Sequence, residues 1–189
     1  MQLHPEERPS EWVRRFAPLV AADARVLDLA CGAGRHTRFF ADRGCRVVAI
    51  DREPRFDNAL ASRAEVDVRR ADLEQGDWPL AGEGFDAVVV TNYLHRPLFP
   101  HILAALAPGG VVVYETFALG NAAFGRPGNR EFLLAPRELL DVFGSELRVI
   151  AFEDGYTETP RPAMVQRIAA VKPATDGTVA PQQVALHPS

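Results

Sequence analysis

The sequence predicts an α/β fold in which helices cover both faces of a doubly wound, mostly parallel sheet. Short apolar runs alternate with helical patterns over residues 25–116, which is typical of parallel strands joined by helices. Two later apolar runs have no helix between them, so we expect them to pair as antiparallel strands at one edge. The 189 residues, of which 47% are hydrophobic and 24% charged, suit one globular domain with its own core.

The first half of the chain is expected to start with an amphipathic helix over residues 10–20. Ser10 suits the N-cap, and Trp12 and Phe16 lie on one helical face. The elements expected next are a strand at 25–30, a helix at 35–43, a strand at 45–50, a short helix at 54–62 and an edge strand at 66–71.

The second half is expected to add a central strand at 85–91, where the apolar run is continuous. Residues 97–114 carry no formal charge, but Pro100, Pro108 and the Gly109-Gly110 pair divide them into a helix, a turn and a buried strand instead of a membrane span. The remaining expected elements are strands at 111–116, 147–152 and 164–171, a long polar segment at 117–130 and a helix after residue 136.

These elements place residues 1–173 in one domain. Residues 174–189 show no periodicity and are expected to form a disordered tail. The N-terminal residues lack the apolar region of a signal peptide.

Charge and cysteine content narrow the expected partners and compartment. The chain has 21 basic and 25 acidic residues, a net charge of −4, which disfavours nucleic acid and anionic membranes as partners. Lys172 is the one lysine; the arginines are scattered among acids, which favours a genomic composition bias over phosphate binding. Cys31 and Cys45 are too few for a disulfide framework and lack metal-ligand spacing. We expect a cytoplasmic protein, monomeric or homodimeric, without a metal site.

Acidic residues and glycines gather where the expected parallel strands end, which is where open α/β sheets bind ligands. Gly32 and Gly34 lie between a strand and a helix and permit close approach to the backbone. Asp28 lies inside an apolar strand, so either backbone N–H groups of the following turn satisfy it or it faces a cationic group of a ligand. Asp51 ends the second strand and suits a ribose diol, and Asp72 ends the third and suits an exocyclic amine.

Three acids around a glycine turn favour a nucleoside without phosphates over a dinucleotide, because a pyrophosphate prefers basic residues and free N–H groups. The dinucleotide pattern G-x-G-x-x-G also fails, since Thr37 stands at its third glycine.

The run Val-Leu-Asp-Leu-Ala-Cys-Gly-Ala-Gly at 26–34 resembles the first motif of class I S-adenosylmethionine-dependent methyltransferases. Asp51, the run at 70–73, the strand at 85–93 and the Pro-Gly-Gly turn at 106–111 fall at later motifs of that family, in order. The resemblance implies S-adenosyl-L-methionine as cofactor and a seven-stranded sheet of order 3-2-1-4-5-7-6 with the last strand antiparallel. The small size and the glycine-rich loop are similar to those of bacterial tellurite-resistance methyltransferases.

Carried over to this sequence, the resemblance places several residues near the methionine half of the cofactor. Gly32 and Gly34 would lie against it. Asp28 would help to hold its ammonium group, together with backbone around Ala30 and Asn92. Alanine at position 30 departs from the family, which usually has glycine there.

The resemblance assigns the other cofactor groups in the same way. Arg35 would lie near the carboxylate, and Asp51 would bind the ribose. Arg52 and Leu73 would flank the adenine, with Asp72 on its amino group.

The acceptor side is expected to involve residues after the strand at 85–91. Here the chain reads Asn92-Tyr93-Leu94-His95 and not the Asn-Pro-Pro-Tyr of relatives that methylate nucleic-acid amines. Tyr93 and His95 are candidates for catalysis and substrate binding. The sequence favours two interpretations of His95 equally, a general base and a surface histidine.

The segment 115–130 is long, glycine-rich and aromatic, so it suits either a lid over the acceptor or a surface loop. Four of its side chains look selective for an aromatic or anionic group and are candidate substrate-binding residues: Phe117, Phe124, Arg126 and Arg130.

The sequence thus predicts an S-adenosylmethionine-dependent methyltransferase that acts on a small-molecule acceptor by in-line transfer. Two alternatives stay open: a nucleoside- or dinucleotide-binding module without transferase activity, and a nucleic-acid or protein methyltransferase. The acidic charge and the absence of an added recognition domain argue against the latter.

Overall fold

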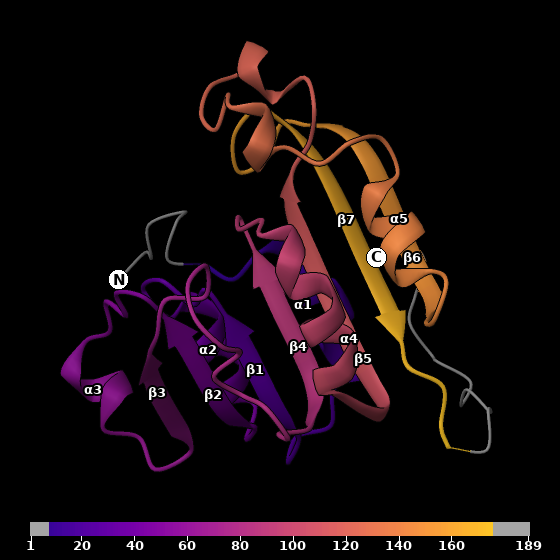
Figure 1. Cartoon of the computed structure of the whole chain (residues 1–189). Coiled ribbons are helices and arrows are strands. Elements are labelled where there is room, and N and C mark those ends of the chain that lie inside the picture. Colours follow the sequence, from indigo (N-terminus) through magenta and orange to yellow (C-terminus); the bar gives the residue numbers. More distant parts are fainter. Residues whose placement is uncertain (1–7, 176–189) are drawn as a thin grey trace.

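The computed structural model describes residues 8–175 and shows one seven-stranded sheet with helices on both faces (Figure 1). The strands are β1 (Arg25–Leu29), β2 (Arg46–Asp51), β3 (Val66–Arg70), β4 (Phe85–Thr91), β5 (Leu106–Phe117), β6 (Arg148–Thr157) and β7 (Ala163–Val171). Their order is β3-β2-β1-β4-β5-β7-β6, and β7 runs antiparallel to both of its neighbours. The predicted fold class and strand order are confirmed.

The helices lie where the apolar periodicity predicts them, although most are shorter. They are α1 (Glu11–Phe16), α2 (Arg35–Asp42), α3 (Asn58–Ala61), α4 (Phe99–Ala105) and α5 (Glu138–Phe143), with 3₁₀ turns η2 (Ala17–Leu19), η3 (Arg96–Leu98), η4 (Asn121–Ala123) and η5 (Arg130–Phe132). The Ser10 side chain accepts hydrogen bonds from the N–H groups of Trp12 and Val13, so the expected N-cap is confirmed.

Two hydrophobic layers form the core. On one face, α4 and α5 pack through Phe99, Ile102 and Phe143 against β1, β4 and β5. On the other face, α1 and α2 pack through side chains that include Trp12 and Phe40. Because both faces are covered, the central strands are mostly apolar on both sides, as in the run of buried residues at 87–90.

Two strands are longer than predicted. β5 begins at Leu106, so the Pro108-Gly109-Gly110 segment is part of an irregular strand, and its pairing with β4 shifts between Phe85 and Ala87. β6 continues to Thr157, because its antiparallel pairing with β7 extends to Ala163. The expected tail lies outside the described residues from position 176 onward.

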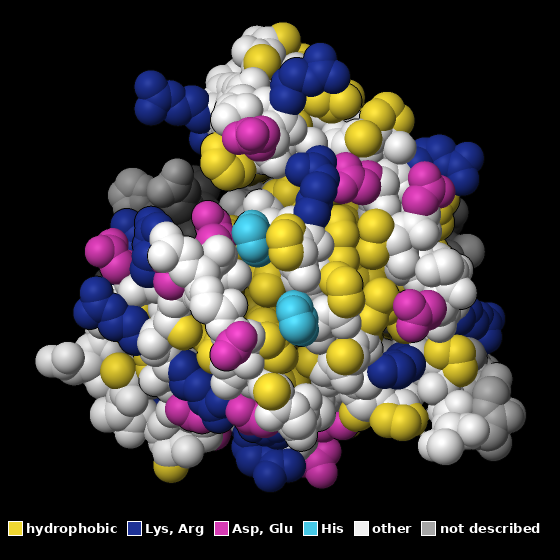
Figure 2. Space-filling model, in the orientation of Figure 1, with side chains coloured by type: hydrophobic (Ala, Val, Ile, Leu, Met, Phe, Trp, Pro, Cys, Tyr) yellow, Lys and Arg dark blue, Asp and Glu magenta, His cyan; other side chains and the backbone are white. Residues whose placement is uncertain are grey.

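Residues 97–114 form α4 and most of β5, and no helix within residues 8–175 has the length and apolar character to cross a membrane. Figure 2 shows basic and acidic side chains interleaved around a hydrophobic area on the face that carries α4 and α5. On this face the arginines do not form a basic patch, in agreement with their scattered positions in the sequence.

Candidate functional site

A cavity of about 380 Å³ opens where β1, β2, β3 and β4 end. Seven of the residues singled out in the sequence line it: Ala30, Gly32, Asp51, Arg52, Asp72, Leu73 and Tyr93. Three further residues of the wall, Glu53, Arg55 and Glu74, were not predicted from the sequence. Each lies within four residues of Asp51 or Asp72, and this closeness in sequence could have indicated that they line the same cavity.

The turn after β1 has a backbone conformation that favours glycine. Ala30 and Gly32 both have φ of 55°, and Gly34 has φ of 77°. A Cβ atom at Gly32 would meet nothing within 4 Å, so this glycine borders open space at the cavity. A Cβ at Gly34 would lie 2.8 Å from both Leu60 and Phe56, so this glycine lets the turn pack against neighbouring side chains. Its predicted contact with a cofactor stays a prediction.

The carboxylate of Asp51 is held in place by the backbone. One oxygen accepts a hydrogen bond from the Gly32 N–H at 2.9 Å, and the other accepts from the Glu53 N–H at 2.8 Å. Each oxygen has a second lone pair, so the carboxylate retains capacity for two further donors such as a vicinal diol. Asp72 is anchored in the same manner, accepting from the Glu74 N–H at 2.9 Å.

Asp28 is buried in β1, with 2% of its surface exposed. Its carboxylate accepts a 2.6 Å hydrogen bond from the hydroxyl of Thr37 on α2. Burial raises the pKa of Asp28 to about 6, although hydrogen bonds from the Thr37 side chain and backbone oppose the rise. Thr37 lies on α2, so its hydroxyl takes the place of the turn N–H groups that the first alternative names. Asp28 does not line the cavity, and its role toward an ammonium group stays a prediction.

Tyr93 contributes to the cavity wall, and its backbone carbonyl accepts a 2.9 Å hydrogen bond from the Tyr114 hydroxyl. Burial raises the pKa of the Tyr93 phenol above its usual value, and the nearby carboxylates of Glu74 and Asp72 raise it further. The phenol therefore keeps its proton and is suited to donate a hydrogen bond, which does not fit the role of a general base.

Apart from Tyr93, the predicted acceptor-side residues do not line this cavity. His95 precedes η3 and is half-buried. Phe117 is buried in a small cluster with Leu133 and Val165. The remaining three, Phe124, Arg126 and Arg130, are exposed on the segment between β5 and α5. Their roles in catalysis and substrate binding stay predictions.

The other cofactor candidates, Arg35 and Asn92, lie beside the cavity and not in its wall. Asn92 has φ of 55°, and its N–H donates to the carbonyl of Glu115. Arg35 begins α2 and donates to the hydroxyl of Thr91 at 3.4 Å. Both flank the end of β4, where the resemblance places the methionine half of a cofactor.

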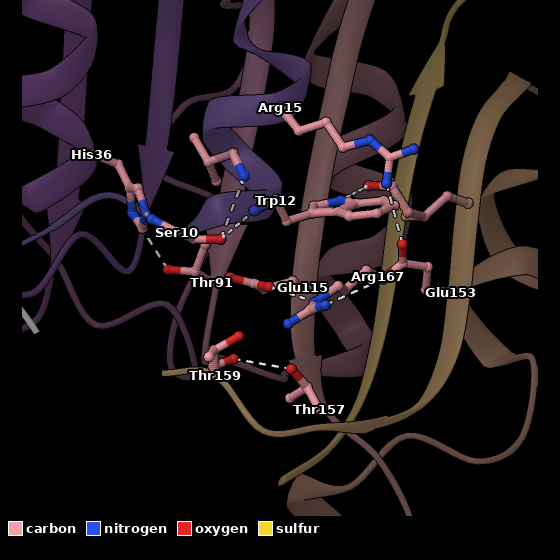
Figure 3. A network of polar contacts seen from close by, with 12 residues as sticks. Ser10, Trp12, Arg15, His36, Thr91, Glu115, Glu153, Thr157, Thr159 and Arg167 are labelled. Atoms are coloured by element: carbon pink, nitrogen blue, oxygen red, sulfur yellow. Dashed lines mark hydrogen bonds and ion pairs between the residues drawn. The ribbon is translucent and has the colours of Figure 1, made fainter. Parts of the chain in front are cut away.

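A buried histidine that sequence reasoning missed connects α1 to this region (Figure 3). The Ser10 N–H donates to Nε2 of His36 at 3.1 Å, so the neutral ring carries its proton on Nδ1, which lies 3.4 Å from the Thr91 hydroxyl. Burial lowers the pKa of His36 well below its usual value, and the charge of Arg35 lowers it further. No periodic pattern in the sequence marks this residue.

A row of charged side chains crosses β5, β7 and β6 on the α1 face (Figure 3). Arg167 donates to Glu115 at 2.9 Å and to Glu153 at 3.2 Å, and Arg15 of α1 reaches Glu153 at 3.3 Å. Glu115 is nearly buried and directly opposite Thr91 in the strand register. The sequence does contain a signal for Glu115, because it is an acidic residue inside the apolar run of β5.

Residues 26–110 match the family model described as a methyltransferase domain. A trans-aconitate 2-methyltransferase from Paracidovorax citrulli is 35% identical over 119 residues, which cover 57% of this chain and 44% of the relative. The chain spans about half the length of the curated relatives it matches.

Solved structures share the fold. TehB from Haemophilus influenzae matches with a TM-score of 0.66 and 18% identity over 90% of this chain and 62% of TehB. A Burkholderia thailandensis 1,6-didemethyltoxoflavin-N1-methyltransferase, solved with its namesake ligand and S-adenosylhomocysteine, matches with a TM-score of 0.64 and 22% identity over 86% of this chain and 76% of that one. These structural matches show the fold. The domain match at residues 26–110 agrees with the resemblance to methyltransferases.

Proposed function

We propose that this chain is an S-adenosyl-L-methionine-dependent methyltransferase that acts on a small-molecule acceptor, since residues 26–110 match a methyltransferase domain and the fold agrees with it. The observation that carries the proposal is the cavity at the ends of β1 to β4, which the expected nucleoside-binding residues line. Supporting it, two backbone N–H groups orient the Asp51 carboxylate, and the open space at Gly32 leaves room for a ligand beside it.

The charges around the cavity suit a cationic ligand without phosphates. Four acids line it, Asp51, Glu53, Asp72 and Glu74, against two arginines, Arg52 and Arg55, so the net negative charge of the wall disfavours a pyrophosphate. Asp28, buried beneath the same turn, would face an ammonium group from the methionine side. Arg35 would take the matching carboxylate.

When bound, S-adenosyl-L-methionine supplies an activated methyl group on a sulfonium. The protein's part is to hold the acceptor atom in line with that methyl group and to exclude water. His95 would accept a proton from a hydroxyl or amine acceptor, and a thiolate acceptor would need no base. Phe117, Phe124, Arg126 and Arg130 would select the acceptor from the segment beyond β5.

A small acceptor is consistent with the relatives. The trans-aconitate and 1,6-didemethyltoxoflavin enzymes are named for small molecules. The net charge of −4 disfavours nucleic acid as the alternative acceptor.

Calorimetry with S-adenosylhomocysteine tests the cofactor assignment. We expect binding in the micromolar range, and we expect Asp51→Ala to weaken it at least about tenfold, because two or more hydrogen bonds to a charged acceptor are lost. The matched control is Asp141→Ala, which removes an exposed aspartate on α5 and leaves binding unchanged. Unchanged affinity in Asp51→Ala contradicts the role of Asp51, and tighter binding of NAD than of S-adenosylhomocysteine favours a dinucleotide-binding module instead.

A methyl-transfer screen tests the reaction itself. Labelled methyl donor is incubated with thiol, phenol, amine, selenite and tellurite acceptors, and we expect transfer to one of these classes.

A further inference from the structure

Arg55 lines the cavity at the ends of β1 to β4 and brings to it a positive charge that the fold leaves unpaired. The residue is exposed, and its guanidinium makes no hydrogen bond or ion pair within residues 8–175. A guanidinium carries five N–H donors and no acceptor, in a planar arrangement that matches a carboxylate or a phosphate. Because the net charge of the wall disfavours a pyrophosphate, a single carboxylate is the group that suits this cation.

The loop between β2 and α3 holds the backbone of Arg55 against the turn that follows β1. The Arg55 N–H donates a hydrogen bond to the carbonyl of Gly32 at 2.9 Å. Earlier in the loop, the Glu53 N–H donates to the Asp51 carboxylate at 2.8 Å, and directly after Arg55 the side chain of Phe56 packs against the hydrophobic layer that contains α1 and α2. Arg55 is therefore fixed beside Gly32, where a Cβ atom would meet nothing within 4 Å.

This position indicates which part of a ligand Arg55 would meet. The resemblance places Gly32 against the methionine half of S-adenosyl-L-methionine, and that half carries the carboxylate of the molecule. Adenine and ribose have no negative charge, so the carboxylate is the group of this cofactor that a guanidinium can pair with as an ion. Arg35, which the proposed function also places at this carboxylate, donates to Thr91 from the start of α2 and does not line the cavity.

We propose that the Arg55 guanidinium binds the carboxylate of the methionine half of the cofactor. The carboxylate then meets a cation from the loop after β2 in addition to Arg35 from α2. This inference rests on the proposed function, since it requires a ligand with an adenosine and an amino acid group in the cavity.

The substitution Arg55→Gln tests this role, because it removes the charge and keeps a polar side chain. Calorimetry compares S-adenosylhomocysteine, which carries the carboxylate, with methylthioadenosine, which has the same nucleoside and a thioether but no amino acid group. We expect the affinity for S-adenosylhomocysteine to fall about tenfold, because a charge-assisted pair is lost, and the affinity for methylthioadenosine to stay unchanged. The melting temperature of the ligand-free variant should equal that of the wild type, since the guanidinium has no partner in the fold.

Arg46→Gln is the matched control, because it makes the same change in net charge. Arg46 is exposed at the first position of β2, whereas Asp51, at the last position of that strand, lines the cavity. This variant should bind both ligands as the wild type does.

The possible results separate the two proposals. A wild-type protein that does not bind S-adenosylhomocysteine overturns the proposed function together with this inference. Unchanged affinity of Arg55→Gln for S-adenosylhomocysteine, or an equal loss in Arg46→Gln, overturns the inference alone. A loss of the same size for methylthioadenosine also overturns it, because Arg55 would then act on the nucleoside half.

Discussion

Asp28 makes the protein less stable above about pH 6, so Asp28→Asn should stabilise it there. The carboxyl group is buried in β1 and its side-chain partner is a neutral hydroxyl, that of Thr37. Burial of a carboxylate with a neutral partner favours the protonated form, and the pKa is accordingly raised from 3.8 to about 6. Asparagine has nearly the same shape, keeps an oxygen for the Thr37 hydroxyl and cannot ionise.

The sign of this pH dependence follows from comparing the protonation of Asp28 in the folded and in the unfolded chain. Below about pH 4, Asp28 is protonated in both the folded and the unfolded chain, and its ionisation costs nothing. As the pH rises, the unfolded chain loses the proton first, so the free energy of unfolding falls until the folded chain also ionises near pH 6. A rise in pKa from 3.8 to about 6 corresponds to a loss of about 3 kcal/mol in full, of which about 2 kcal/mol accrues between about pH 4.5 and about pH 8.

Urea unfolding, followed by circular dichroism at about pH 4.5 and about pH 8, measures this difference. The added amide N–H₂ group of Asp28→Asn needs a partner and offsets the gain by about 1–2 kcal/mol, but by the same amount at both pH values. The stability of the variant relative to wild type should therefore increase by about 2 kcal/mol on going to the higher pH. Asp141→Asn, on the exposed surface of α5, is the control and should show no such increase. A constant difference at both pH values would refute the reasoning.

Substitutions at two positive-φ positions of the turn after β1 should change the stability in opposite directions, and thermal unfolding measures both. Ala30→Gly should stabilise the protein by about 1 kcal/mol, because φ of 55° is strained for alanine and ordinary for glycine. Gly34→Ala should destabilise it by about 1–3 kcal/mol, because the new Cβ would lie 2.8 Å from Leu60 and Phe56 at φ of 77°. Shifts of the same sign in the two variants would contradict the conformations described for this turn.

The features that the sequence predicts well depend on residues close together in the chain. The strand at 85–91 is predicted to the residue, since burial on both faces leaves a mostly apolar run in which residues 87–90 are all buried. Asp51 and Asp72 are predicted because each lies at or just after the end of a strand, and parallel strands of a right-handed α/β unit bring those ends to one edge. Asp51 and Asp72 therefore reach the same cavity although 20 residues separate them in the sequence.

The features that the sequence does not predict depend on strand register and on contacts between distant segments. Glu115 meets Arg167 because β5 and β7 pair with those two residues opposite each other, 52 positions apart. His36 is fixed by Ser10 and Thr91, which are 26 and 55 positions away. The length of β6 is likewise set by its pairing with β7 and not by its own apolar run, which ends near Phe152.

An acidic residue inside an apolar strand can have either of two kinds of partner in the fold, and Asp28 and Glu115 are examples of the two. Both are acids within apolar strands, and both side chains are nearly buried. The guanidinium of Arg167 donates to Glu115 at 2.9 Å, so that carboxylate has a permanent cationic partner within the fold. Asp28 has the hydroxyl of Thr37 instead, and its pKa is raised to about 6. A cationic group that arrives with a ligand would stabilise the ionised form of Asp28. The protonation of Asp28 should therefore respond to binding, and the affinity for a ligand that carries an ammonium group should rise as the pH increases through about 6.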